Sequence, residues 1–292
     1  MDVRRERREY KYLIPEAAVA ELGAAFSPFV EPDDHARCRP EGYTVHSIYL
    51  DTPRLTHYHE KLDGIRDRRK VRVRGYDEGG ADAPVFLEIK HKHDMAISKS
   101  RARLCCRDLE PFLATGEIAR YVAGPDGSRD RTDAGRVLYQ IHRHHLRPVI
   151  LIHYRRQAFF RRFDPSVRIT FDHDLRSTPF PALDELHRTV GAVPSLNGNC
   201  ILEVKFHDEM PPWLERLLTA FGLDRTSLSK YTICLDEHGV PERLGVTGKV
   251  PMLAQWPTAP PALRPPSGVL VEPLWLDPTR MAMAPRRAAA TA

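Results

Sequence analysis

Residues 68–76 read RRKVRVRGY, and this stretch decides the fold. Successive side chains of a β-strand point to opposite faces of its sheet. Two kinds of side chain alternate here, basic on one face and apolar on the other: Arg68, Lys70, Arg72 and Arg74 against Val71 and Val73. Cations on one face repel one another unless an anion compensates them. The stretch therefore predicts a strand with an apolar face in a core and a basic face directed at an anion.

The same alternation recurs along the chain. Residues 85–92 (VFLEIKHK) and 200–207 (CILEVKFH) each place a glutamate and a lysine on one face and apolar side chains on the other. The pairs on common faces are Glu88 with Lys90, Glu203 with Lys205, Glu9 with Lys11, Tyr154 with Arg156, and Arg168 with Thr170 and Asp172. One such strand is typical of a solvated surface, but a whole series predicts a shared charged interior.

The remaining pattern predicts an α+β fold. Helical spacing occurs at 15–26, 107–121 and 211–221, and further extended stretches occur at 45–51, 147–157 and 166–175. A closed antiparallel β-barrel of about eight strands, with peripheral helices, is the simplest structure that gives all basic faces one lumen. Such a lumen needs a polyanion, and phosphate suits guanidinium donors. Its carboxylates then favour a divalent cation, Mn²⁺ or Mg²⁺, that bridges to phosphate oxygens.

Composition limits the class of protein. The 292 residues carry 35 arginines and 9 lysines, with a net charge of +5 and a hydrophobic share of 42%. The first residues are charged, and no apolar run approaches the ~20 residues of a membrane span. Five cysteines without CxxC or Cys/His spacing predict reduced thiols and no zinc site. We expect a cytoplasmic protein with a folded domain at 1–245 and a flexible, Pro/Ala-rich tail at 246–292.

An ordered series of strings carries a family resemblance: REYKY, SIYLDTP, DGIRDRRKVRVRGY, FLEIKHK, YRRQAF, VRITFD, ILEVKF and LSKY. Over about residues 4–235 the chain resembles the VTC domain, the polyphosphate polymerase module of the vacuolar transporter chaperone family, within the triphosphate tunnel metalloenzymes. The resemblance implies a tunnel barrel that transfers the γ-phosphate of ATP to a growing polyphosphate chain with Mn²⁺ or Mg²⁺. The hydrolytic branch of that superfamily begins with Glu-x-Glu-x-Lys, whereas Arg7 replaces the first glutamate here.

Carried over by position, the resemblance assigns roles within the tunnel. A clamp on the ATP triphosphate is implied for Arg72, Arg74, Lys90, Arg156 and Arg168. Other substrate contacts are implied for Lys11, Lys70, Lys99, Arg101, Tyr154, Lys205, Ser229 and Lys230, the last two within the Ser-Lys-Tyr signature. Glu203 is the expected metal ligand, with Glu9 and Glu88 as further candidates.

We therefore expect a metal-dependent polyphosphate polymerase. Phosphoryl transfer requires positioning and charge neutralisation, and the attacking phosphate oxygen is already anionic, so no general base is needed. A triphosphatase acting in the same tunnel and a non-catalytic polyphosphate- or nucleotide-binding module are the alternatives. ATP and polyphosphate are the expected partners, and a membrane protein is a candidate recipient of the product. Nucleic acid is disfavoured because the basic strands present no aromatic platform for base stacking.

Overall fold

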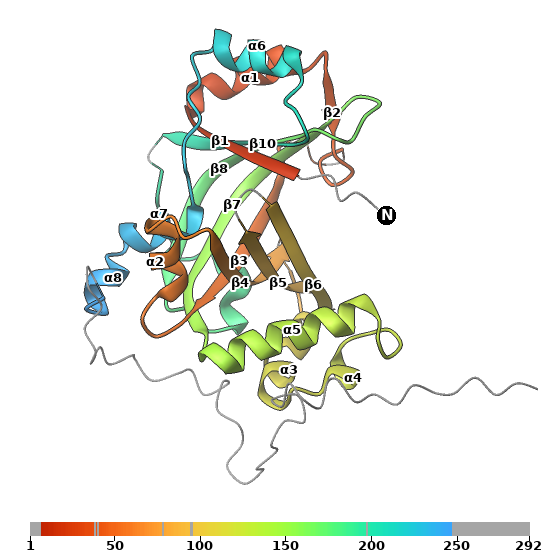
Figure 1. Cartoon of the computed structure of the whole chain (residues 1–292), viewed down its shortest axis with the longest axis vertical. Coiled ribbons are helices and arrows are strands. Elements are labelled where there is room, and N and C mark those ends of the chain that lie inside the picture. The colour runs from red at the N-terminus through yellow and green to blue at the C-terminus, as the bar shows by residue number, and fades with distance from the viewer. Residues whose placement is uncertain are drawn as a thin grey trace, which may run out of the picture.

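The basic strand is the third from one edge of a strongly curled antiparallel sheet (Figure 1). The computed structural model describes residues 7–246, except Cys38, Pro40, Glu78, Asp94, Met95 and Asn197. Eight strands follow the order β1-β10-β8-β7-β3-β4-β5-β6, and the short strands β2 and β9 pair with β7 and β8. Their bounds are β1 Arg7–Pro15, β2 Val30–Pro32, β3 Tyr43–Asp51, β4 Asp67–Tyr76, β5 Pro84–His93, β6 Ala96–Cys105, β7 Arg147–Arg161, β8 Arg168–Pro179, β9 Val193–Pro194 and β10 Asn199–His207.

The prediction of a closed barrel is wrong in one respect, because the sheet forms an open half-barrel. Within the described residues no strand pairing joins β1 to β6. The outer edge of β6 is instead covered by helix α5 (Arg129–His144), whose Asp133 accepts from the Arg101 amide at 2.9 Å and whose Asp130 accepts from the Arg103 amide at 3.4 Å. Edge N–H groups satisfied in this way cannot pair with a further strand.

Helices cover the convex face of the sheet in two places (Figure 1). Helices α3 (Leu109–Thr115), α4 (Ile118–Tyr121) and α5 pack on the apolar sides of β4, β5 and β6, around Val73, Leu87 and Phe112. Helices α1 (Val19–Phe26) and α6 (Pro212–Ala220) pack on β1, β10 and β8. The strand residues that face these helices alternate with the basic series, so burying the apolar face fixes the basic face inward.

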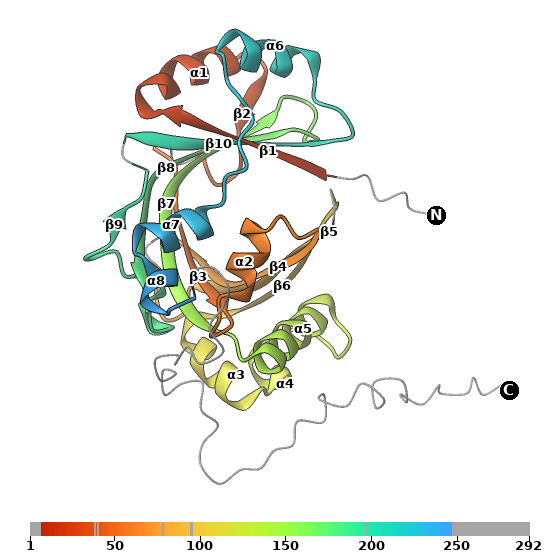
Figure 2. The ribbon, with the colours of Figure 1, turned by 60° about the vertical axis from the view of Figure 1, so that its left-hand side comes forward.

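A third group of helices lies within the curve of the sheet (Figure 2). These helices are α2 (Thr56–Leu62), α7 (Lys230–Glu237) and α8 (Val240–Arg243). Tyr231, Cys234 and Leu235 of α7 pack against Tyr49 and Tyr154 on the concave face. Helix α7 therefore fills part of the interior that the sequence assigned wholly to charged side chains.

Most predicted elements are present, with instructive differences. The 15–26 helix becomes a 3₁₀ turn, Glu16–Ala18, followed by α1. The predicted 107–121 helix splits into a 3₁₀ turn, Cys106–Asp108, then α3 and α4, because Gly116 adopts a left-handed φ of 71°. A third 3₁₀ turn spans Asp184–His187, and the helices α2, α5, α7 and α8 were not predicted. The predicted tail lies outside the described residues, apart from Val246, which is buried.

Candidate functional site

A basic passage runs through the concave side of the sheet. Three cavities of about 660, 350 and 90 Å³ are all bordered by Glu9 and Lys90, so they adjoin one another and together make up the passage. Nearly every site residue predicted from the sequence lines it: Glu9, Lys11, Lys70, Arg72, Arg74, Lys90, Lys99, Arg101, Tyr154, Arg156, Arg168, Glu203, Lys205, Ser229 and Lys230. Glu88 lies beneath this surface with no exposed area.

The narrow middle of the passage carries a large excess of positive charge. Its lining includes eight basic side chains and two carboxylates, Glu9 and Glu203. The walls come from strands far apart in sequence, because β1, β10, β8, β7, β3 and β4 are neighbours in the sheet. Cations concentrated in an enclosed, weakly solvated space attract an anion far more strongly than the same charges on an open surface.

Glu88 organises one wall of the passage. Arg72 contacts one carboxylate oxygen through Nε and a terminal nitrogen, at 2.8 and 2.7 Å, while Lys99 and Arg101 contact the other oxygen at 2.5 and 3.4 Å. Arg74 Nη1 lies 3.9 Å away. Burial alone would raise the pKa of Glu88, but these cations hold it well below its usual value. Glu88 is therefore an ionised anchor that fixes four basic groups.

The opposite wall uses a second anchor. Arg156 donates two hydrogen bonds to Asp172, at 2.6 and 2.8 Å, and Lys230 approaches the same carboxylate at 2.5 Å. Both Lys230 and Arg156 also lie over the ring of Tyr154, at 4.8 and 5.2 Å from its centroid. Asp172 shares its face with Arg168 as the sequence indicated, and its pairing with Arg156 fixes the guanidinium plane.

Arg168 stands at the wider mouth of the passage. Its Nη2 donates to Asp33 at 2.8 Å and to the Tyr43 hydroxyl at 3.2 Å, whereas its Nε is buried without a hydrogen-bond partner. A buried donor left unpaired is costly, and an anion in the passage would satisfy it. Asp33 lies in a loop that carries no periodic pattern, so sequence reasoning missed it.

Glu9 and Glu203 form the carboxylate pair of the site. Lys11 contacts Glu9 at 3.1 Å and Glu203 at 3.7 Å, Lys205 contacts both, and Lys90 donates to Glu9 at 2.8 Å. Although burial raises the pKa of both carboxyls, the lysines hold these pKa values below the usual range. Two ionised, neighbouring carboxylates are a donor set that suits Mn²⁺ or Mg²⁺.

Burial also lowers the pKa values of three lysines in the passage. It lowers the pKa of Lys205 and of Lys99 to about 8 even though each has a carboxylate partner. The pKa of Lys70 falls well below its usual value through burial and through its basic neighbours Lys11 and Lys90. Lys70 donates to Ser229 at 2.7 Å, and Ser229 caps α7 by accepting from the Thr232 amide. The Ser-Lys-Tyr segment thus links α7 to the basic strand.

The two mouths differ in chemistry. One is lined by Lys61, Arg68, Lys92 and Arg225. The other adds aromatic rings to its cations: His35, Tyr43, Tyr76 and Phe86, with the Arg101 guanidinium 3.6 Å from the Phe86 centroid. The premise that the basic strands present no aromatic platform is therefore wrong, since Tyr76 belongs to β4 and Phe86 to β5. For Phe86 the period-2 alternation with Glu88 was an available signal.

Other residues with chemistry-bearing side chains take structural roles. Asp51 accepts from the Thr52 and His57 amides at 2.7 and 2.9 Å, as expected of a turn cap. Helix α5 ends at His144 and His145 adopts a left-handed φ of 52°, so the histidine run at 142–145 is a helix end. His91 pairs with Asp67 at the end of the β4–β5 hairpin.

Comparisons with known proteins agree on one family. The model of the VTC domain matches residues 6–237. Two curated relatives, both called vacuolar transporter chaperone complex subunit 4, come from Trypanosoma brucei brucei and Trypanosoma cruzi and are 24% and 25% identical over 245 residues. Each match covers 74% of this chain but only 30% of the relative.

Solved structures give weaker matches. The Schizosaccharomyces pombe Mediator head module matches with a TM-score of 0.37 and 8% identity, over 83% of this chain and 96% of that one. A monoclinic Mimivirus capping enzyme triphosphatase matches with a TM-score of 0.28 and 10% identity, over 74% and 89%. These TM-scores are too low to carry an argument about the fold. The part of the chain that the structure describes contains no helix long and apolar enough to cross a membrane.

Proposed function

The chain belongs to the VTC domain family, and we propose that it is a metal-dependent polyphosphate polymerase that transfers the γ-phosphate of ATP to a growing polyphosphate chain. The observation that carries this proposal is the basic passage made of three adjoining cavities, with eight basic side chains around its narrow centre. A linear polyanion fits such a passage, because every repeat unit of the polymer carries charge that the walls compensate.

The proposed triphosphate clamp consists of Arg72, Arg74, Lys90, Arg156 and Arg168. Four of these five basic groups form an ion pair within 3.0 Å, to Glu88, Glu9, Asp172 or Asp33, and Arg74 donates to Ser47 at 3.1 Å. Side chains held in this way present their remaining N–H donors without reorganising when substrate arrives, which is how preorganised sites stabilise transferred phosphoryl groups. The aromatic mouth suits the nucleotide end of ATP, since bases stack on such rings.

The metal role falls to Glu203 and Glu9. Glu88 is engaged by four basic groups, so we assign it an organising role rather than a metal-binding one. A divalent ion at Glu203 and Glu9 would neutralise charge on the phosphate oxygens. Lys11, Lys205 and Lys230 line the same stretch of passage and guide the chain, while Lys70, Lys99, Arg101, Tyr154 and Ser229 complete its contacts.

The test is an assay of both possible products. The protein is incubated with ATP and Mn²⁺ or Mg²⁺, and long-chain polyphosphate and free phosphate are measured separately. Polymer is the expected product. Glu203→Gln is expected to lower polymer formation on the order of 100-fold, whereas Glu209→Gln, a change at an exposed glutamate six residues on, leaves it unchanged.

Two outcomes would refute the proposal. Free phosphate without polymer indicates a triphosphatase, and tight polyphosphate binding without turnover, unchanged by Glu203→Gln, indicates a binding module. The relatives' name describes subunits of a complex. A membrane partner that receives the product is accordingly part of the proposal, and pull-down with the full chain checks it.

A further inference from the structure

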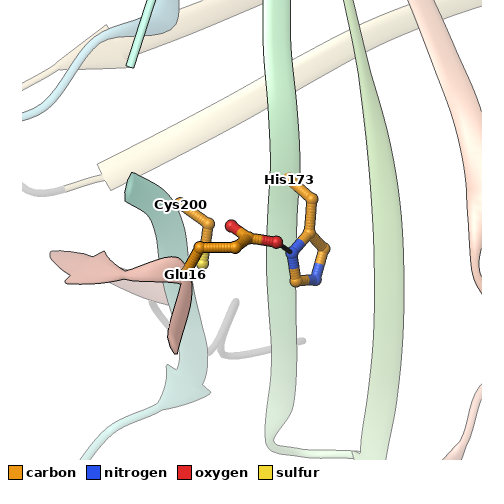
Figure 3. A group of neighbouring side chains, drawn as sticks. All are labelled: Glu16, His173 and Cys200. Atoms are coloured by element: carbon orange, nitrogen blue, oxygen red, sulfur yellow. Dashed lines mark hydrogen bonds and ion pairs between the residues drawn. The ribbon is translucent and has the colours of Figure 1, made fainter. Parts of the chain in front are cut away.

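A second cluster of ligand-type side chains lies on the opposite face of the sheet from the passage. Glu16, His173 and Cys200 each offer one donor atom, and these atoms all lie within 4.8 Å of one another (Figure 3). Cys200 belongs to the core beneath α1 and α6, whereas its neighbours Ile201 and Glu203 point the other way along β10. The cluster is therefore separated from the passage by the sheet itself.

Three elements meet at this point. Glu16 follows the last residue of β1, and its amide donates to the Gly198 carbonyl at 2.9 Å, while His173 and Cys200 come from β8 and β10. His173 and Cys200 are buried, with 4% and 0% exposure, whereas the Glu16 side chain is 44% exposed. Glu16 also borders a cavity of about 350 Å³ together with Asp174 and Gly198. Glu16 therefore lies between solvent and the two buried donors.

The hydrogen bonds of His173 orient its ring so that Nδ1 faces Glu16. Nε2 lies 3.0 Å from the side-chain amide oxygen of Gln157, and donating to that acceptor places a proton on Nε2. Nδ1 faces Glu16 Oε1 at 2.5 Å. In the neutral ring that arrangement would place a nitrogen lone pair against a carboxylate. At 2.5 Å the two atoms share a proton in the metal-free chain. A metal ion, whose bonds to nitrogen and to oxygen are each about 2 Å, would replace that proton once the half-exposed Glu16 side chain moves back from the ring.

We propose that Glu16, His173 and Cys200 bind a borderline-soft divalent metal ion of the zinc type. A sulfur, an imidazole nitrogen and a carboxylate oxygen are three of the donors that Zn²⁺ accepts, whereas Mg²⁺ and Ca²⁺ disfavour sulfur. The side-chain oxygen of Gln157 serves as the outer hydrogen-bond acceptor that commonly orients a metal-bound histidine. Three protein ligands leave the fourth position to water from the adjoining cavity.

The ion would have a structural role. β1 is an edge strand of the open half-barrel, and it carries Glu9 and Lys11 into the passage. β1 is held to β10 by backbone pairing, and a metal bound at the C-terminal end of β1 would add a cross-link that also reaches β8. Binding to the folded chain alone stabilises it by mass action.

Cobalt spectroscopy tests the site independently of activity. The full chain is freed of metal with a chelator, kept reduced and titrated with Co²⁺ and then Zn²⁺. One equivalent of Co²⁺ is expected to give a thiolate-to-cobalt charge-transfer absorption, which Zn²⁺ abolishes because it binds more tightly. The carboxylate pair in the passage has no sulfur and cannot produce that band. Zn²⁺ is also expected to raise Tm.

Matched variants separate the site from other thiols. Cys200→Ser is expected to lose the band, while Cys234→Ser, at an equally buried cysteine, and a Cys105→Ser/Cys106→Ser double variant keep it. Glu16→Gln, at an exposed residue that tolerates change, and Gln157→Ala are expected to weaken Zn²⁺ binding by about 10- to 100-fold. Absence of the band, its survival in Cys200→Ser, or unchanged affinity in Glu16→Gln would each overturn the proposal and leave a His173–Glu16 salt bridge.

Discussion

Replacing Glu88 by glutamine distinguishes an organising anchor from a metal ligand. The carboxylate has no exposed surface, and it compensates Arg72, Arg74, Lys99 and Arg101. Glutamine keeps the shape and one acceptor oxygen but removes the charge. The change therefore leaves buried guanidinium groups uncompensated rather than opening a cavity.

The magnitude follows from the burial of the partners. Lys99 and Arg101 are 42% and 39% exposed, so solvent screens their share, whereas Arg72 and Arg74 are 14% and 8% exposed. Removing one member of a buried pair costs about 3–5 kcal/mol. Because glutamine still accepts a hydrogen bond, we expect about 3 kcal/mol for Glu88→Gln. For a domain of this size that corresponds to a fall in Tm of about 6–12 °C.

The assay is thermal unfolding with and without inorganic tripolyphosphate. A triphosphate supplies the missing negative charge, so the ligand is expected to raise Tm more in the variant than in the wild type. The control is Glu117→Gln, which removes the carboxylate from an exposed pair with Arg120 at 3.2 Å and is expected to cost no more than about 1 kcal/mol. A variant that melts within about 2 °C of the wild type, or one that gains no extra stabilisation from tripolyphosphate, refutes the anchor role.

Two further predictions concern pH. Because the pKa of Lys99 and of Lys205 is about 8 in the free protein, tripolyphosphate affinity is expected to fall as pH rises from 7.5 to 9, by about 10-fold for each lysine. Calorimetric titration measures this, and Lys205→Arg, which stays charged, is expected to remove its share of the slope; an unchanged slope contradicts the assignment. His46 is 2% exposed, and burial together with His187 and His153 lowers its pKa to about 4. The unfolded chain then binds more protons between pH 6.5 and 4, so stability is present above this window and is lost as pH falls through it, by about 3 kcal/mol. Denaturant unfolding of His46→Gln is expected to show a correspondingly smaller loss between pH 7 and 4.5, and equal losses in variant and wild type would exclude the histidine as the cause.

The direction of each basic side chain could be predicted from sequence, because strand alternation is local. Val71 and Val73 are buried under the helices of the convex face, and so Arg72 and Arg74 face the passage. The open edge could not be predicted in the same way. It depends on Asp130 and Asp133 reaching the amides of β6 from a helix that the sequence analysis did not identify.

Contacts between side chains that are distant in the sequence could not be predicted either. Glu16, His173 and Cys200 are widely separated in sequence, so no ligand spacing marks them, and the prediction from spacing was that no zinc site exists. The same applies to Asp33, a loop residue that supports Arg168 from 135 positions away. Spacing rules detect sites whose residues lie on one turn or one hairpin. The cluster at Glu16 and the contact of Asp33 with Arg168 instead join segments that only the folded sheet brings together.

Register also separates two motifs that look alike. Glu88 and Glu203 both lie in an apolar-Leu-Glu-apolar-Lys strand, so local sequence gives them the same role. In the sheet, Glu88 lies opposite Arg72 on one side and Arg101 on the other, while Glu203 lies opposite Lys11 and Thr170. The first carboxylate is enclosed by guanidinium groups that it must neutralise. The second has a neutral hydroxyl on one side and shares Lys11 and Lys205 with Glu9, so two carboxylates lie together where the proposed metal would bind. The flanking strands therefore give the two carboxylates different surroundings. If Glu203 holds a metal ion as proposed, the two variants are expected to fail differently: Glu88→Gln in stability and Glu203→Gln in turnover.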